Sequence, residues 1–341
     1  MNARQYFYSI IKKENKGKSY QKIYQEKIYN GNNTLIGKKI LRHIPKWSND
    51  RLLEELVVKL INNNSDYIRK RLENVFIAKI RDFKSNAYAV QSMVEYWGDL
   101  VYFHVGLSDA CFQFTTVYTE FLQARGKIKI DEHSDKMAYV NVLIHVHKLL
   151  EAIKDWTIQN EDIVGLKENT IIIPESNKIE QKAASIAVLT DLFILSHEVS
   201  HHLLGHTGKR NDGLTVLNLL PKDCRYWENK NLNHSNEYQA DALALMLMLG
   251  ISASNFTQSQ LAKGESRKEI ETVLGSLLTL SILKLMSKDS NKPSETHPSI
   301  DSRIEQCKKI LSLFVTDTLL NSFDSEISDF CTLFETIKKG N

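Results

Sequence analysis

Residues 196–206 read SHEVSHHLLGH and contain the pattern H-E-x-x-H within a stretch that has the apolar period of a long helix. On a helix, His197 and His201 lie one turn apart and project from the same face, so both imidazoles can bind one metal ion. Glu198 lies between them and would flank the open coordination position, where a general base is needed. The pattern therefore predicts a catalytic zinc site, and the alternative is a polar helix stripe with two solvated histidines.

The helix that carries this pattern is expected to begin near residue 179 and to end at the glycines of residues 205–208. Extrapolated along the same helix, His202 would point about 100° away from the ligand face and His206 about 180° away. We therefore expect both side chains to support the site from behind or to lie on the surface. Thr207 stands where a metzincin would place its third histidine, which excludes that class.

A catalytic zinc ion needs three protein ligands and one open position. Residues 236–245 read NEYQADALAL, which predicts an apolar helix that begins with two acids one turn apart. Carboxylates buried on such a helix need a partner. We assign Glu237 as the third ligand and Asp241 as the acceptor that holds a ligand histidine by its other ring nitrogen. The alternative for Glu237 is a charge favoured by the dipole at a helix N-terminus.

Residues 295–304 read ETHPSIDSRI. His297 precedes a proline and is therefore pushed out of helical geometry, so we expect it at a junction between loop and helix, free to point into a cleft. Arg303 follows on the helix and could pair with the buried carboxylates.

These three motifs, in this order, resemble the gluzincin metallopeptidases of the HtpX and type I CaaX-protease group over residues 179–310. In that group E-x-x-A-D supplies the third ligand and H-P-x-x-x-x-R closes the site. The resemblance implies a single Zn²⁺ and a role for each motif residue: ligands His197, His201 and Glu237, base Glu198, supporting residue Asp241, and His297 with Arg303 stabilising the site or the reacting carbonyl.

The block HEVSHHLLGH followed by EYQAD also resembles soluble proteases that cut phage repressors and phage-exclusion proteases of the Lit type, which cut a translation factor. Either likeness implies a cytosolic protease with one or few protein targets and a regulatory or phage-defence role. The HtpX and CaaX-type relatives are membrane proteins, but the longest apolar runs noted here, 242–251 and 273–286, are shorter than the roughly 20 residues that span a bilayer. We therefore expect no membrane span and carry over no membrane substrate.

Apolar residues at helical spacing recur along most of the chain, over residues 52–61, 68–83, 88–123, 137–156 and 179–194. The predicted fold is mainly α (α+β): a zincin-like metallopeptidase core with an active-site helix and a small edge-stranded sheet, preceded by a helical N-terminal domain. Residues 168–174, ENTIIIP, are the best strand candidate. Their proline suits an edge strand that aligns substrate, although a strand without a substrate role fits equally well.

We divide the chain into a basic extension (1–46), a helical domain (47–165), the metallopeptidase domain (166–312) and a C-terminal helix (313–341). Residues 1–46 contain eleven Lys or Arg and two Glu, a charge of +9, so the remainder carries −6 of the total of +3. A solvated surface or a protein contact explains this patch better than nucleic acid does. Residues 209–233 are polar and irregular, and we expect them to cover the site as a gate.

The four cysteines are far apart and show no metal or redox spacing, and no secretion signal precedes the body, so we expect a cytoplasmic protein. The expected partners are a protein or peptide substrate and an activator or gating partner. Two other classes stay open: a non-catalytic, metal-stabilised binding module, and a protein that associates with nucleic acid through its basic N-terminus. The presence of Glu198 favours an enzyme over a non-catalytic binding module, because a binding module has no need of a general base beside the metal.

Overall fold

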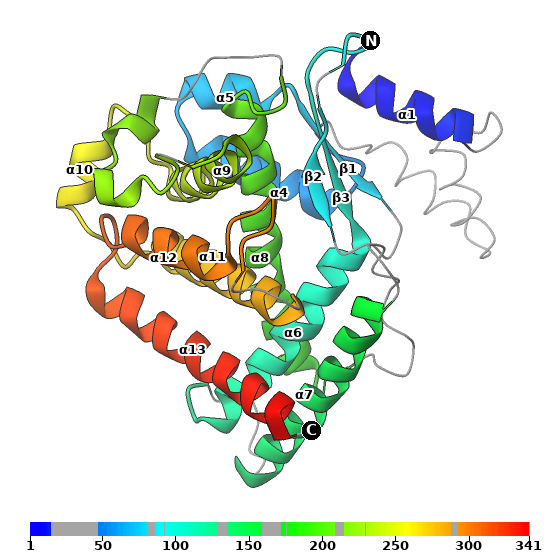
Figure 1. Ribbon diagram of the computed structural model, residues 1–341, viewed down its shortest axis with the longest axis vertical. Helices are drawn as coiled ribbons and strands as arrows, with labels where there is room; N and C mark the ends of the chain where they lie inside the picture. The colour runs from blue at the N-terminus through cyan, green and yellow to red at the C-terminus, as the bar shows by residue number, and fades with distance from the viewer. Residues whose placement is uncertain are drawn as a thin grey trace.

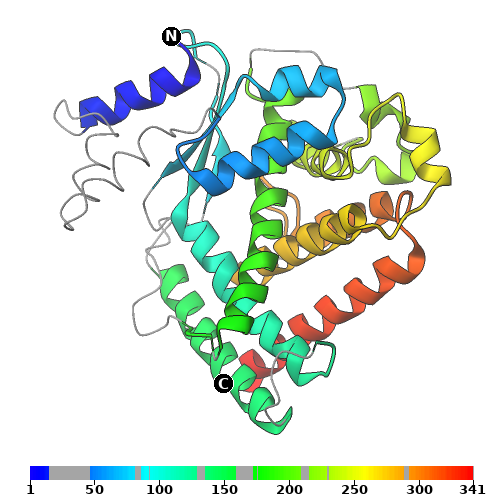
Figure 2. The same ribbon diagram turned by 180° about the vertical axis from the view of Figure 1, so that it is seen from behind.

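The computed structural model describes residues 1–14, 47–80, 86–91, 93–128, 135–158, 172–174, 176–208, 215–228, 230–287 and 292–340. Its central element is helix α8 (Asn177–Leu203), which crosses the middle of the molecule (Figures 1 and 2). The Ser176 side chain caps this helix by accepting a hydrogen bond from the Ile179 amide at 3.3 Å. The second half of α8 is buried nearly all round, because other elements pack on it from several sides.

Among the described residues, the helices that pack most extensively on α8 are α6 (Val105–Ala124), α9 (Leu232–Leu249) and α11 (Arg267–Met286). Gly275 allows α11 to approach closely, since a Cβ at this position would lie 2.7 Å from the Leu189 carbonyl oxygen on α8. An outer layer is formed by α7 (Asp135–Ile158) on α6, α12 (Ile300–Leu311) on α9 and α11, and α13 (Asp317–Gly340) on α11 and α7.

A continuous hydrophobic cluster extends from Leu53 to Phe334. It therefore includes residues of all three predicted segments that follow residue 46, while the division of the chain into these segments stays a prediction. Further helices among the described residues are α4 (Arg51–Asn63), α5 (Asp66–Leu72), α10 (Phe256–Leu261), and the 3₁₀ turns η2 (Thr215–Leu219) and η3 (Lys222–Cys224).

The sheet has the strand order β1-β3-β2. Strand β1 (Val75–Ile80) is parallel to β3 (Asp99–His104), and β2 (Ala87–Ala89) is antiparallel to β3. Among the described residues β2 is thus an edge strand of this sheet, and it packs against α8. The Val90 amide donates to the Leu100 carbonyl and the His104 amide to the Asn86 carbonyl, so by alternation the backbone groups of Ala87 and Ala89 point away from β3.

The N-terminal helix α1 (Ala3–Glu14) covers the sheet beside β1 and β3 (Figure 1). Phe7 is buried there with Phe76 and Leu100 in a second, smaller hydrophobic cluster. The start of the predicted basic extension is therefore a packed helix, and residues 15–46 of that extension lie outside the described residues.

The mainly helical fold with a small sheet is confirmed, and so are the predicted helices near residues 52–61, 137–156 and 179–203. The helix predicted over 68–83 is wrong beyond Leu72, because residues 75–80 form β1. The two helices predicted over 88–123 are wrong in their first half, which forms β2 and β3. Both strands of the parallel pair are largely buried, so their apolar runs lack the alternation that would distinguish them from a buried helix.

The strand predicted over 168–174 lies outside the described residues up to residue 171, and residues 172–174 belong to no strand. His145 is buried on α7, and its Nδ1 lies 2.6 Å from Glu120 Oε2 on α6. Among the described helices, α8 alone is long and apolar enough to cross a membrane, with a mean hydropathy of 1.3. Because 78% of that apolar window is buried inside the protein, α8 has the properties of a core helix.

Candidate metal centre

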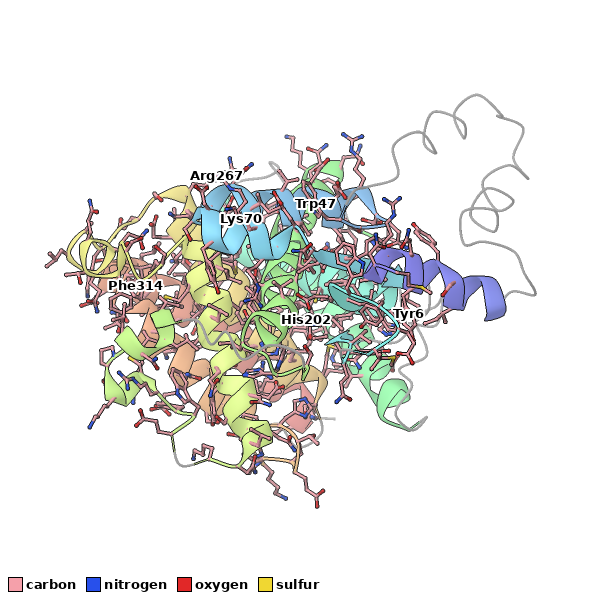
Figure 3. The ribbon with its side chains drawn as sticks, turned by 90° about the horizontal axis from the view of Figure 1, so that it is seen from above. Tyr6, Trp47, Lys70, His202, Arg267 and Phe314 are labelled. Atoms are coloured by element: carbon pink, nitrogen blue, oxygen red, sulfur yellow. The ribbon has the colours of Figure 1, made fainter. Side chains whose placement is uncertain are left out.

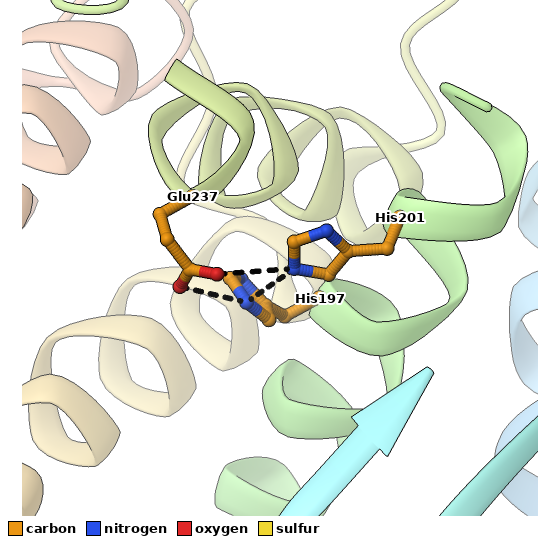
Figure 4. Close-up of side chains that lie close together, drawn as sticks. All are labelled: His197, His201 and Glu237. Atoms are coloured by element: carbon orange, nitrogen blue, oxygen red, sulfur yellow. Dashed lines mark hydrogen bonds and ion pairs between the residues drawn. The ribbon is translucent and has the colours of Figure 1, made fainter. Parts of the chain in front are cut away.

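Side chains from α8 and α9 converge on one point at the C-terminal end of α8 (Figure 4). The Nε2 atoms of His197 and His201 are 3.1 Å apart. Glu237 Oε2 lies 3.5 Å from the first of these nitrogens, and Glu237 Oε1 lies 3.5 Å from the second. Within the described part of the chain, this is the one group of three metal-ligating side chains whose donor atoms all lie within 4.8 Å of one another.

These residues fit a zinc ion by donor type, since catalytic zinc takes imidazole nitrogens and a carboxylate and keeps one position open. Burial lowers the pKa of His201 well below its usual value, and the neighbouring His197 adds to this effect. Burial also opposes charge on His197, but hydrogen bonds to Asp241 and Glu237 outweigh it and raise the pKa of His197 to about 10. Metal binding at this site would therefore release a proton from His197.

Asp241 lies behind the His197 ring, on the same face of α9 as Glu237. Its Oδ1 lies 2.9 Å from His197 Nδ1, the ring nitrogen turned away from the cluster. Arg303 on α12 donates to both Asp241 oxygens at 2.7 and 2.8 Å, and its Nη1 lies 3.4 Å from Glu237 Oε2. Burial alone would raise the pKa of Asp241, but Arg303 and His197 outweigh burial and lower it. Once His197 has lost its proton, two carboxylates and one guanidinium leave a net negative charge, which favours a cation.

Glu198 lies on α8 next to His197, and its Oε2 accepts a hydrogen bond of 2.7 Å from the Ala89 amide of strand β2. Burial raises the pKa of Glu198 to about 7, and repulsion from Glu237 acts in the same direction. A carboxyl group with a pKa near neutrality can both accept and return a proton. The Ala89 contact was not predicted, because a backbone donor leaves no signature in the sequence.

His297 lies in the loop before α12, as predicted, and 60% of its side chain is exposed. Its Nε2 is 4.0 Å from Glu237 Oε1, and its Nδ1 is 2.8 Å from Thr296 Oγ1. A cavity of about 410 Å³ opens beside the cluster, lined by Tyr88, Ala89, Gln91, His201, His206, Thr207, Asn233, Asn236, Glu237, Thr296 and His297. Its wall is therefore formed by β2, the end of α8 and the turn that follows it, the start of α9 and the loop before α12.

The helical extrapolation for His206 is wrong, because α8 ends at Leu203. Gly205 follows with φ 77°, a left-handed conformation that glycine adopts without strain, and the chain turns back. His206 Nδ1 then lies 3.0 Å from His201 Nδ1, and His206 Nε2 lies 3.3 Å from Gln239 Oε1 on α9. Gly205 was the available signal for this turn.

His202 is buried in the interior, near the centre of the view in Figure 3. Its Nε2 lies 2.9 Å from the Leu100 carbonyl of β3, and its Nδ1 lies 3.0 Å from Thr207 Oγ1. His202 thus ties the turn after α8 to the sheet and does not join the three ligating groups.

The sequence was compared with family models, curated proteins and solved structures. None of the curated proteins and none of the solved structures matched the chain significantly. The model of the peptidase U49 family matches residues 107–321, which include α8, α9 and α12 and hence every residue of the cluster. The match covers more than half of the chain, and the protein therefore belongs to the peptidase U49 family.

Proposed function

We propose that the protein is a zinc-dependent endopeptidase that hydrolyses peptide bonds in one or few cytoplasmic protein targets. The observation that carries this proposal is the convergence of His197, His201 and Glu237 on one point beside a cavity, in a chain of a peptidase family. The motif likeness to gluzincins agrees with this ligand set.

The chain's own residues account for the proton transfers of the proposed reaction. Zinc, when bound, supplies a Lewis acid that polarises a carbonyl group and lowers the pKa of water. Glu198 takes a proton from the attacking water and returns it to the leaving amine. The hydrogen bond from the Ala89 amide fixes one carboxylate oxygen of Glu198 and so orients the base. His297, with Thr296 at its Nδ1, can present an Nε2 proton to the reacting carbonyl oxygen.

Strand β2 supports an extended substrate conformation. It forms the edge of the sheet, lines the cavity with Tyr88 and Ala89, and turns the backbone groups of Ala87 and the Ala89 carbonyl away from β3, while the Ala89 amide donates to Glu198. We propose that the substrate peptide lies along this edge, in the role that was predicted for residues 168–174.

We propose that the segment after α8 takes part in regulating the enzyme. Residues 215–228, the larger described part of the predicted gate, pack through η2 on α9 and through η3 on α12, the helices that carry Glu237 and Arg303. An activator that moves this segment is our proposed partner. A phage-defence role is supported by the motif likeness to Lit-type proteases, with which the family match agrees.

The proposal is tested by expressing the parent chain and the Glu198→Gln variant and comparing cut cellular proteins by mass spectrometry. We expect Glu198→Gln to bind zinc as the parent does and to lose the cleavage, by about 10²–10⁴-fold in rate. Glu180→Gln, the same substitution at an exposed position of α8, serves as the control and should cleave like the parent. Cleavage by Glu198→Gln at the parent rate would refute the role of Glu198. If the parent chain binds zinc and cuts no cellular protein, the result would indicate a binding module.

A further inference from the structure

The turn that follows α8 brings a third histidine to the back of the second ligand. Gly205, at φ 77°, reverses the chain, and the His206 amide donates to the His201 carbonyl at 2.9 Å. Thr207, bonded to the buried His202, anchors the turn on its other side. His206 is therefore held in place by the backbone and by a neighbouring buried contact.

The two nitrogens of the His201 ring face different groups. Nε2 points to His197 and Glu237, as Figure 4 shows, while Nδ1 faces His206 Nδ1 at 3.0 Å. An imidazole that offers Nε2 to a metal carries its proton on Nδ1. His201 then donates this bond and His206 Nδ1 accepts it.

The direction of the remaining bonds follows from this first one. With Nδ1 as acceptor, a neutral His206 carries its proton on Nε2, which lies 3.3 Å from Gln239 Oε1. Gln239 accepts through this oxygen and donates through Nε2 to Ser235 Oγ at 2.9 Å. Each of the three hydrogen bonds from His201 to Ser235 thus joins a donor to an acceptor, and the amide orientation of Gln239 agrees with the tautomer that metal binding requires.

We propose that His206 and Gln239 are positioning residues that hold His201 in the tautomer and orientation required for binding zinc. This inference rests on the proposed zinc site. His206 is not itself a ligand, because it contacts the ring nitrogen of His201 that faces away from the cluster. The two ligand histidines are supported differently: His197 by the carboxylate of Asp241, and His201 by the neutral pair of His206 and Gln239.

The test measures the zinc affinity of the full-length chain by competition with a chromophoric chelator. His206→Asn places a carboxamide oxygen where Nδ1 stands, so the acceptor for His201 is kept, whereas the similarly shaped His206→Leu removes it. We expect His206→Leu to bind zinc about 10–100-fold more weakly than the parent, and His206→Asn to stay within about threefold. His234→Leu is the control, since His234 contacts the Ser294 carbonyl outside the cluster, and it should bind like the parent.

The absorption spectrum of the cobalt-substituted protein provides a readout that a general loss of stability would not change. We expect the cobalt bands to shift in His206→Leu and to be retained in His206→Asn. If His206→Leu fails to fold, Gln239→Leu removes the next acceptor and should weaken zinc binding in the same direction.

Three outcomes separate the two proposals. Weak binding by His206→Leu with recovery in His206→Asn supports the inference. Parent-like zinc affinity and cobalt bands in His206→Leu, together with lost binding in His201→Ala, overturn the inference and leave the zinc site intact. A parent chain that binds no stoichiometric zinc, or a His201→Ala variant that binds as the parent does, overturns both.

Discussion

Asp241 connects His197, a proposed ligand, to the Arg303 guanidinium, because its carboxylate contacts both side chains. It is fully buried, and Arg303 is 8% exposed. Removing one partner of a buried ion pair leaves the other charge without compensation, at a cost of about 3–5 kcal/mol. The pair therefore matters for the stability of the fold as well as for the ligand that it orients.

We predict that Asp241→Asn lowers the free energy of unfolding by about 3 kcal/mol and weakens zinc binding about 10–100-fold. Asp301→Asn on the same helix as Arg303 is the comparison, because Asp301 is 44% exposed and pairs with Lys284 at the surface. That substitution should cost no more than about 1 kcal/mol. Urea unfolding of both variants, with chelator competition, measures the difference. Equal losses in the two variants would contradict the structural role given to Asp241.

At this scale, residue type alone predicted that the side chains of His197, His201 and Glu237 lie together, while their role as zinc ligands stays a prediction. Glu237 and Asp241 stood out because acids on an apolar helix need partners, and the structure places both beside His197. Ala89 and Gln239 were missed, since a backbone amide and a neutral side chain carry no charge pattern. His206 was misplaced because the helical period was extended past Leu203, where the helix ends.

Helix α8 contains a second buried acid, Asp191, six residues before His197. Both of its carboxylate oxygens lie within hydrogen-bond distance of Ser108 Oγ on α6, at 3.2 and 3.1 Å. Burial raises the pKa of Asp191 to about 7, although the Ser108 hydrogen bond and Lys79 oppose the shift, while Asp50 and Asp109 add to it. The folded state therefore binds a proton at this group more tightly than the unfolded state does.

A raised acid pKa gives stability that is present at low pH and lost as the pH rises through the folded pKa. We predict that this contribution falls between about pH 4 and pH 7, and that Asp191→Asn removes this component of the pH dependence. At pH 8 the variant should be more stable than the parent by about 1–4 kcal/mol, with little difference near pH 4. Urea unfolding across this range measures the effect. A variant that is less stable than the parent at pH 8 would show that the carboxylate is favoured in the fold.

The elements that the sequence predicted best are the long helices, whose period repeats over several turns. The strands were the weak point, since β1 has six residues, is mostly apolar, and follows α5 after two residues. A short run of apolar residues is found both in buried strands and in buried helices, so the hydrophobic period cannot distinguish a strand from a helix there. Strand β2, which lines the cavity, has three residues and no detectable pattern.

For the molecule as a whole, the proposed zinc ligands come from two helices that pack against each other through a large apolar core. The fold should therefore persist without the metal, unlike a zinc finger. We predict that a chelator lowers the melting temperature of the zinc-loaded chain by at least about 5 °C and leaves the helical circular dichroism signal intact. Added zinc should restore the melting temperature. Global unfolding on chelation, or an unchanged melting temperature, would contradict this expectation.

The mainly helical class was predictable because composition and period are properties of the whole chain. The sheet topology was not, since pairing of β1 with β3 joins segments that are separated by β2 and a loop, and local patterns do not encode such contacts. The packing of α1 on the sheet was missed for the same reason. The prediction for residues 1–46 rested on their charge and took no account of the apolar face around Phe7.

The central claim is that His197, His201 and Glu237 bind one zinc ion with a fourth position open. Zinc X-ray absorption of the full-length chain, purified at one zinc per molecule, tests this claim directly. The account predicts nitrogen and oxygen ligands at about 2.0–2.2 Å, with the outer-shell scattering of two imidazoles and no sulfur. A sulfur ligand at about 2.3 Å, or a coordination shell without imidazole, would contradict it.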